Sequence, residues 1–282
     1  MNINWYPGHM AKTKRLIGEQ LKYIDIVYEI VDARIPYSSR MKDIDNVLKG
    51  KERLLIFTKI DLCDKKETKE WISYYEKKGY YVVTVDLLNN KGIEDILKVS
   101  KSILSNKRQN KIDKGLKVTK IKALILGIPN VGKSTLINRL VGKKATNVGN
   151  KPGITKSNQW IRINDEIELL DTPGLLWPKI ESDEVALNLA SMTAIKEEIV
   201  PSDDVAIYIL KTLNKYYPNS LKERYDISDI DFSDIVSIYE KIGKKRGALI
   251  KSGEVDYDKV SSIIIKDLRD GYLGNVTFDR CS

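Results

Sequence analysis

Short apolar runs alternate with helical patterns along the first two-thirds of the chain. β-Branched and aromatic residues are concentrated in six runs that predict strands, at 24–31, 53–57, 81–85, 122–126, 161–163 and 166–170. Residues 65–77 and 93–103 carry apolar side chains at helical spacing. This alternation predicts an α/β fold, a mainly parallel sheet with helices on both faces. Ligands of such sheets bind where the strands end, at the carboxyl edge.

Beyond about residue 180 the strand patterns give way to successive helical ones. These predicted helices cover residues 184–196, 203–215, 233–241 and 257–269, and their expected N-caps are Asp203, Ser228 and Asp256. We therefore predict an α/β domain at 1–178, with an N-terminal segment at 1–22 that holds a helix near 11–22. A small all-helical domain is expected to follow at 179–282.

Composition narrows the class of protein. Apolar residues make up 42% of the 282 residues, enough for a sizeable core. No run of about 18 apolar residues predicts a transmembrane helix, and the N-terminus lacks the apolar region of a signal peptide. The two cysteines, Cys63 and Cys281, have neither metal-ligand spacing nor the density of a disulfide scaffold. We expect reduced thiols in a cytoplasmic protein.

The chain carries a net charge of +9, and the charge is unevenly distributed. Residues 201–282 hold 13 Lys and Arg against 14 Asp and Glu, whereas residues 1–200 hold 35 against 25. The densest basic stretch, 101–122, has eight cations and one acid, Asp113. Such an excess favours polyanions such as RNA. A solvated linker remains an alternative for this stretch, and charge alone does not distinguish RNA from a membrane surface.

Residues 127–134, with the sequence GIPNVGKS, match the phosphate-binding pattern GxxxxGK[ST]. They follow a predicted strand and precede a helical pattern at 135–140, which is the context that identifies a P-loop. Backbone N–H groups at such a helix N-terminus cradle phosphates. Lys133 is expected to contact the β- and γ-phosphates, and Ser134 to ligate Mg²⁺. The predicted phosphate-binding residues are Asn130, Val131, Gly132, Lys133, Ser134 and Thr135.

Two further motifs suit the switches of such a site. Asp171-Thr172-Pro173-Gly174 follows an apolar strand, so the Asp171 carboxylate is expected to hold Mg²⁺ through water, and the Gly174 N–H to reach the γ-phosphate. Between this motif and the P-loop lies Pro152-Gly153-Ile154-Thr155. Thr155 is a candidate second hydroxyl ligand of Mg²⁺ that engages when its loop closes on the γ-phosphate.

A candidate base reader, Thr58-Lys59-Ile60-Asp61, follows the strand at 53–57. The Asp61 carboxylate can accept both the N1–H and the N2 amino hydrogens of guanine, a paired contact that adenine cannot make. The Lys59 stem can lie over the ring. Nothing of the form NKxD or TKxD follows Gly174. The base reader therefore precedes the P-loop, which predicts a circularly permuted P-loop GTPase domain.

This order of motifs resembles the circularly permuted GTPases of ribosome assembly, within them a bacterial large-subunit assembly factor. The resemblance extends over nearly the whole chain and includes residues 4–10, 32–36, 159–160, 175–178, 222–225 and 244–247. It implies a GTPase that binds the assembling large subunit and its rRNA. Such a protein uses GTP binding and hydrolysis to control a late maturation step and its own release, with Mg²⁺ as cofactor.

The resemblance also implies roles at three further positions. The family's second base-recognition loop usually reads Ser-Ala, which is absent here, so backbone N–H groups of Asp86 or Leu87 would have to reach the guanine. Leu175 stands where many GTPases carry the glutamine that positions water, and the family's N-terminal histidine, here His9, is its candidate replacement. Asn130 resembles the asparagine that helps coordinate K⁺ in potassium-activated GTPases.

Alternatives remain for several of these assignments. His9 is also compatible with a surface, capping or RNA-contacting role, and Arg34 with a structural ion pair or an RNA contact. The chain as a whole could be a GTPase of another class, acting in tRNA modification or signalling. It could also be a nucleotide-gated RNA-binding module with negligible hydrolysis.

Overall fold

The computed structural model describes residues 15, 17–40, 44–142, 159–171, 180–195, 199–228 and 230–281. Its centre is a six-stranded sheet in the order β3-β2-β1-β4-β6-β5. The strands are β1 (Ile26–Asp32), β2 (Glu52–Thr58), β3 (Tyr81–Thr84), β4 (Ile121–Gly127), β5 (Gln159–Arg162) and β6 (Ile167–Asp171). All neighbours are parallel except β5, which pairs antiparallel with β6. The predicted α/β fold is confirmed.

The strand order explains how a permuted sequence builds one site. The first three strands form one half of the sheet and the last three the other, and β1 and β4 join them at the centre. In register, Ile30 on β1 faces Gly127 on β4. Because these strands are parallel, their carboxyl ends meet at one edge of the sheet. Four of the five parallel strands end at that edge with Asp32, Thr58, Gly127 and Asp171.

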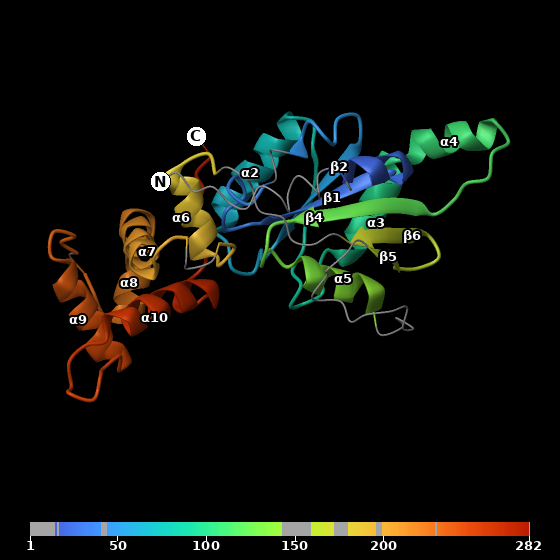
Figure 1. The fold of residues 1–282 in the computed structure, drawn as a ribbon. Coiled ribbons are helices and arrows are strands. Elements are labelled where there is room, and N and C mark those ends of the chain that lie inside the picture. The colour runs from blue at the N-terminus through green and yellow to red at the C-terminus, as the bar shows by residue number, and fades with distance from the viewer. Residues whose placement is uncertain are drawn as a thin grey trace.

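Helices cover both faces of the sheet, as Figure 1 shows. On one face α2 (Lys65–Lys77) packs Trp71 and Tyr75 against Phe57 of β2. On the other face lie α3 (Ile93–Ile103) and α5 (Lys133–Val141), and the Ser100 hydroxyl of α3 is 2.8 Å from the hydroxyl of Tyr28 on β1. The bounds of α2 and α3 agree with the predicted ranges.

The chain after residue 180 is helical, as predicted. It forms α6 (Asp183–Ser191), α7 (Ser202–Tyr216), α8 (Pro218–Tyr225), α9 (Ile235–Arg246) and α10 (Tyr257–Arg269). Of the expected N-caps, Asp256 caps α10 by accepting a hydrogen bond from the Lys259 N–H. Asp203 and Ser228 were wrong, because α7 already begins at Ser202 and Asp234 caps α9.

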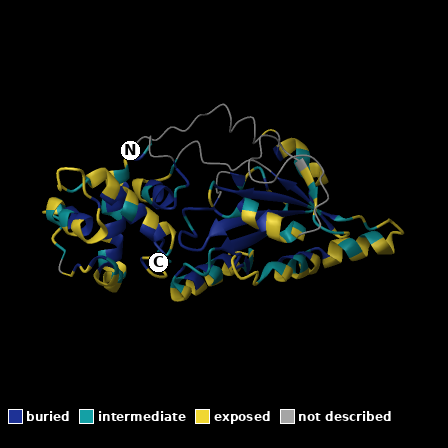
Figure 2. Ribbon diagram, turned by 90° about the horizontal axis from the view of Figure 1, so that it is seen from below, coloured by how far each residue is buried: buried dark blue, intermediate teal, exposed yellow. Residues whose placement is uncertain are grey.

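A basic helix that the sequence did not predict, α4 (Ser105–Asp113), projects from the end of the sheet opposite the helical region (Figure 1). None of its residues is buried, and it is exposed or half-buried along its whole length at the right of Figure 2. Residues 104–120 connect α3 to β4 and therefore join the two halves of the permuted domain. We call residues 104–120 the linker arm.

The segment 276–281 returns to the α/β part of the molecule. The Val276 N–H donates to the Leu62 carbonyl at 3.1 Å, and the Phe278 N–H to the Arg34 carbonyl at 2.7 Å. The predicted domain boundary between residues 178 and 179 remains a prediction. Segment 276–281 follows this boundary in the sequence but forms hydrogen bonds with residues that precede it. Of the predicted N-terminal helix, residues 17–20 are helical and lead into a 3₁₀ turn, Leu21–Tyr23. Within the described ranges no helix is long and apolar enough to cross a membrane.

Candidate nucleotide-binding site

The P-loop lies where β4 ends and α5 begins. A Cβ atom on Gly127 would come within 2.9 Å of a Val131 methyl and 3.2 Å of Ile30, so this close approach requires glycine. Asn130 has φ 60° and Gly132 has φ 95°, both left-handed, and α5 starts at Lys133 with Gly132 as its N-cap. Alternating backbone of this kind turns successive N–H groups inward and forms an anion-binding nest.

Lys133 and Asp171 meet at the carboxyl edge of the sheet. The Lys133 Nζ lies 2.7 Å from Asp171 Oδ1, and the two side chains are 8% and 3% exposed. Asp171 ends β6, the neighbour of β4, so parallel pairing brings it beside the first turn of α5, where half-buried Ser134 and exposed Thr135 follow Lys133. A hydroxyl and a carboxylate beside a phosphate cradle suit Mg²⁺, which prefers oxygen ligands and keeps several waters.

The TKID segment is tied directly to the P-loop. The Thr58 hydroxyl lies 2.6 Å from the Val131 carbonyl oxygen and 3.1 Å from that of Val31. A Cβ on Gly132 would meet the Thr58 side chain at 3.7 Å. Lys59, next along the chain, is left-handed at φ 55°. Segments 73 residues apart in the sequence therefore share one surface, as the permuted order predicts.

Asp61 is placed to accept a ligand. It is half-buried, and within the part of the chain that the structure describes its carboxylate has no hydrogen-bond or ion-pair partner. Burial lowers the pKa of the neighbouring Lys59, although Asp32 opposes this shift from 3.7 Å away. The Lys59 stem is therefore held in a partly desolvated position, which suits packing against a planar ring.

Arg34 is a structural residue. It is fully buried, and its Nε and Nη2 donate to the two Asp32 carboxylate oxygens at 3.0 and 2.9 Å. Burial alone would raise the pKa of Asp32, but Arg34, with help from Lys59, holds that pKa below its usual value. The ion-pair alternative for Arg34 is confirmed, and an RNA contact is excluded because the side chain does not reach solvent.

The loop predicted to be the second base-recognition loop lacks the Ser-Ala pair of the family and is organised by Asp86. Its carboxylate accepts hydrogen bonds from the N–H groups of Leu88 and Asn89 at 3.0 Å and from the Asn89 side chain at 2.7 Å. The Asn89 bonds hold the pKa of Asp86 below its usual value. The Asp86 N–H is already donated to the Lys91 carbonyl at 3.0 Å. Leu87 Cδ1 comes within 3.3 Å of the Cβ position of Gly132, so the loop packs on the P-loop and leaves Leu87 N–H as the candidate donor.

One contact joins the P-loop to the helical region and was not predicted. The Asn130 side-chain nitrogen lies 2.6 Å from the Thr193 carbonyl oxygen, just after α6. Thr193 is itself left-handed at φ 56°, a conformation that β-branched residues rarely adopt. Three predicted site residues, His9, Thr155 and Gly174, lie outside the described residues.

Comparisons with known proteins identify the family of the chain. A family described as "50S ribosome-binding GTPase" matches residues 122–238. "Ribosome biogenesis GTPase A" of Priestia megaterium is 46% identical over 99% of this chain and 97% of its own length. The protein of the same name from Bacillus licheniformis is 47% identical over 99% of both chains. The chain belongs to the ribosome biogenesis GTPase A family.

The solved structures give the same assignment. The crystal structure of GNP-bound YlqF from T. maritima matches with a TM-score of 0.66 and 28% sequence identity, covering 95% of this chain and 98% of that one. As a member of this family, the chain is a GTP hydrolase with a circularly permuted α/β fold, and both predictions are confirmed. Its substrate is GTP.

Proposed function

We propose that this GTPase binds the assembling large ribosomal subunit in the cytoplasm, where GTP binding and hydrolysis control a late maturation step and its own release. The names of its relatives support the ribosomal part. The net charge of +9 is consistent with an rRNA partner. The two rival classes, a tRNA-modifying or signalling GTPase and a non-hydrolysing RNA-binding module, lack support of this kind.

The phosphate end of the nucleotide is assigned to the P-loop. The N–H groups at 130–135 hold the phosphates, and Lys133 neutralises the β- and γ-phosphate charge. Binding requires Lys133 to exchange its contact with Asp171 for phosphate oxygens. Ser134, Asp171 and the Thr155 hydroxyl would hold Mg²⁺, which supplies positive charge between the phosphates. Gly174 would donate its N–H to the γ-phosphate.

The guanine end is assigned to two loops that pack on the P-loop. Asp61 accepts from N1–H and the N2 amino group, Lys59 covers one face of the ring, and Thr58 fixes the loop by its contact with the Val131 carbonyl. Leu87 N–H is the candidate donor to the guanine carbonyl. The charge-assisted pair at Asp61 provides the preference over adenine.

The observation that supports a switch most directly is the contact of Asn130 with Thr193. Asn130 is in the nucleotide-binding loop and Thr193 in the helical region, so a shift of the P-loop backbone changes this contact. The helical region is then biased by the nucleotide. The helical region would then make different contacts with the subunit in the GTP and GDP forms, and this difference would set the affinity for the subunit. A ligand can shift a conformational equilibrium only by the difference between its affinities for the two conformations.

Hydrolysis needs a group that positions water, and Leu175 cannot do so. We assign that task to His9, and a charge-stabilising K⁺ to the side-chain oxygen of Asn130. His9 belongs to the N-terminal segment, so docking of that segment on the subunit would bring the imidazole to the phosphates.

Sedimentation of the protein with large subunits tests the proposal. Binding is expected to be stronger with a non-hydrolysable GTP analogue than with GDP. It should weaken steeply with salt, because neutralising phosphates releases counterions. If the affinity for large subunits depends neither on the bound nucleotide nor on the salt concentration, a nucleotide-dependent switch that docks on RNA is refuted.

Single-turnover GTP hydrolysis with and without subunits separates a GTPase cycle from nucleotide-gated binding alone. Thr155→Ala should spare GDP binding and reduce the response to the γ-phosphate. If Thr155→Ala weakens GDP and GTP binding equally, this loop is structural and not a switch.

A further inference from the structure

The linker arm, which joins the two halves of the permuted domain, has an unusual composition for a connection. Its helix α4 is nine residues long and has no buried residue, and Ile112 is its only apolar side chain. Isolated helices of this length are marginal in water, and helices without an apolar face gain little from packing. The connection is also longer than the few residues that usually join a helix to the next strand in such folds. Neither core packing nor the need to connect α3 to β4 explains this helix, which leaves room for a binding role of the arm.

The charge of the arm is one-sided. Residues 104–120 contain six basic residues and a single acid, Asp113. Two of the lysines are paired at the base of the arm, Lys107 with Asp25 at 3.9 Å and Lys120 with Glu168 at 3.3 Å. Among the described residues, no carboxylate lies within ion-pair distance of Lys111, Lys114 or Lys117.

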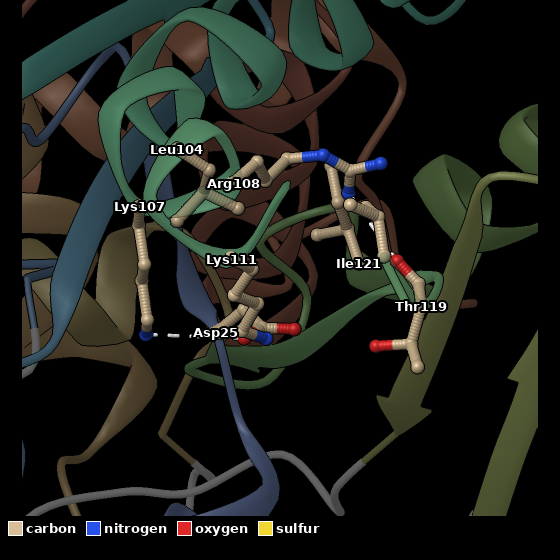
Figure 3. A pocket seen from close by; sticks show the side chains of 8 residues that line it. Asp25, Leu104, Lys107, Arg108, Lys111, Thr119 and Ile121 are labelled. Atoms are coloured by element: carbon tan, nitrogen blue, oxygen red, sulfur yellow. Dashed lines mark hydrogen bonds and ion pairs between the residues drawn. The ribbon is translucent and has the colours of Figure 1, made fainter. Parts of the chain in front are cut away.

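The base of the arm is anchored to the sheet, as Figure 3 shows. A pocket there is lined by α4 on one side and by Thr119 and Ile121 on the other. Arg108 donates to the Thr119 carbonyl at 3.4 Å, and Lys107 faces Asp25 at the start of β1. The arm is thus held at a set position at the amino edge of the sheet. This edge is opposite the carboxyl edge that holds the nucleotide site.

Exposed aromatic rings continue the basic surface beyond the arm. Lys122, which follows the arm on β4, places its Nζ 5.3 Å from the Trp160 ring centre and 5.9 Å from that of Tyr23. Tyr23 is 51% exposed and Trp160 is 39% exposed. Lys22 lies 4.9 Å from the Tyr23 ring. Aromatic rings set among cations are the arrangement on which unpaired bases stack.

We propose that the linker arm and the Tyr23–Lys122–Trp160 surface form an RNA-docking site on the G domain. The cations of the arm contact phosphates, and the two rings receive an unpaired base. This inference rests on the proposed function, since it assigns rRNA as the partner of this surface. A membrane fits less well, because α4 lacks the apolar face that interfacial helices bury.

The test compares two full-length variants that lose the same charge. One carries Lys107→Gln, Lys111→Gln, Lys114→Gln and Lys117→Gln in the arm. The control carries Lys65→Gln, Lys66→Gln, Lys69→Gln and Lys77→Gln, four exposed lysines of α2. Filter binding to protein-free RNA extracted from large subunits is measured across a salt series. GTP affinity and intrinsic turnover verify that each variant is folded.

The arm variant is expected to bind at least tenfold more weakly than the control. Its slope of log affinity against log salt should fall by roughly 2–4 units, about 0.7–0.9 per lost phosphate contact. Trp160→Ala should weaken binding about tenfold or more without changing that slope, because base stacking contributes about 1–3 kcal/mol and carries no charge.

Three outcomes contradict the inference. Equal losses in the arm and control variants would mean that only net charge matters. Unchanged RNA binding, with weakened binding to phosphatidylglycerol vesicles, would make the arm a membrane contact. If the unmodified protein binds neither this RNA nor large subunits, the proposed function fails together with the inference. In the first two cases, if the protein still binds large subunits, the inference alone fails and the proposed function stands.

Discussion

The Asn130 side-chain nitrogen donates to the Thr193 carbonyl oxygen at 2.6 Å and lies 3.2 Å from the Thr193 hydroxyl. A carbonyl only accepts, so the amide must present its NH₂ to Thr193. Among the described residues the Asn130 side-chain oxygen accepts no hydrogen bond, so it remains available to a cation. One side chain can therefore serve two contacts, the cation through its oxygen and the helical region through its nitrogen.

Substitutions at Asn130 should separate these two contacts. Asn130→Asp keeps an oxygen for K⁺ but loses the donor to Thr193, whereas Asn130→Ala loses both. We expect hydrolysis to remain faster in KCl than in NaCl for the Asp variant and not for the Ala variant. Both variants should lose about 1 kcal/mol of stability with the hydrogen bond. If both variants lose the K⁺ effect equally, the side-chain oxygen is not sufficient for K⁺ activation, and the contact of the amide nitrogen with Thr193 is required for it.

Asp61 should determine the choice of base. Asp61→Ala removes a paired, charge-assisted contact, so GTP and GDP affinity should fall on the order of 10²-fold, equivalent to about 3 kcal/mol. The fold should be unaffected, since Asp61 has no polar partner within the described residues. Asp61→Asn should shift the preference from guanine toward xanthine, measured by nucleotide titration. Equal affinity of the unmodified protein for ATP and GTP would refute the assignment.

Arg34 should be a stability residue. Arg34→Met breaks its buried ion pair with Asp32, and removing one partner of such a pair typically destabilises by about 3–5 kcal/mol. The matched control is Arg162→Met. Arg162 pairs with Asp165 on the surface, and its side chain is 62% exposed, so about 0–1 kcal/mol is expected. Urea unfolding measures the free energy of unfolding of both variants. A loss for Arg34→Met as small as that for Arg162→Met would contradict the structural role of Arg34.

His9 should act in turnover and not in nucleotide affinity. His9→Ala is expected to leave GTP affinity nearly intact. It should lower subunit-stimulated turnover by roughly 10²–10⁴-fold, the range typical of positioned acid–base groups. It should also prolong residence on the particle. Turnover is measured with saturating large subunits. Unchanged stimulation would rule out catalysis, and a collapse of subunit affinity would make His9 a docking residue.

Asp279 should make stability depend on pH. Its carboxylate is buried and accepts hydrogen bonds from the backbone N–H groups of Tyr37 and Ser38. Burial raises the pKa of Asp279 to about 6. A raised pKa favours the protonated folded state, so this stabilisation is complete below the unfolded value of about 4 and is lost as pH rises through 6.

The uncharged Asp279→Asn variant does not titrate. The stability of the wild type relative to this variant should therefore be greater at pH 4 than at pH 7, by about 2 kcal/mol. Denaturant unfolding at several pH values measures this difference, with exposed Asp165→Asn as background. A difference that grows with pH would reverse the sign and mean that hydrogen bonding outweighs burial at Asp279.

The parts predicted from sequence are those with a local pattern. The P-loop was found because pattern, preceding strand and following helix are contiguous, and α2 and α3 because their apolar faces repeat every three to four residues. The linker-arm helix α4 was missed because it packs no apolar face on the core, so its sequence has no apolar residues at helical spacing. The short helix α8 was missed for lack of length, since Pro218 begins it and it ends at Tyr225.

Long-range polar contacts were the other part that the sequence did not reveal. Thr193 meets Asn130 across 63 residues, and Asp279 meets Ser38 across 241. Neither Thr193 nor Asp279 belongs to a motif, so nothing in the linear order indicated them. The position of the Asp86 loop was predicted, but the hydrogen bonds from its carboxylate to Leu88 and Asn89 were not.

The return of segment 276–281 to the sheet has a consequence for synthesis. Thr277 donates to the Ala33 carbonyl, and the two residues are 244 positions apart in the chain. At about 5–20 residues per second, the ribosome delivers the second partner on the order of 10–50 s after the first. Until then the carbonyl groups of Leu62 and Arg34 lack their backbone donors, the N–H groups of Val276 and Phe278. The α/β part of this GTPase therefore reaches its full set of hydrogen bonds only after that distant segment has emerged from the ribosome.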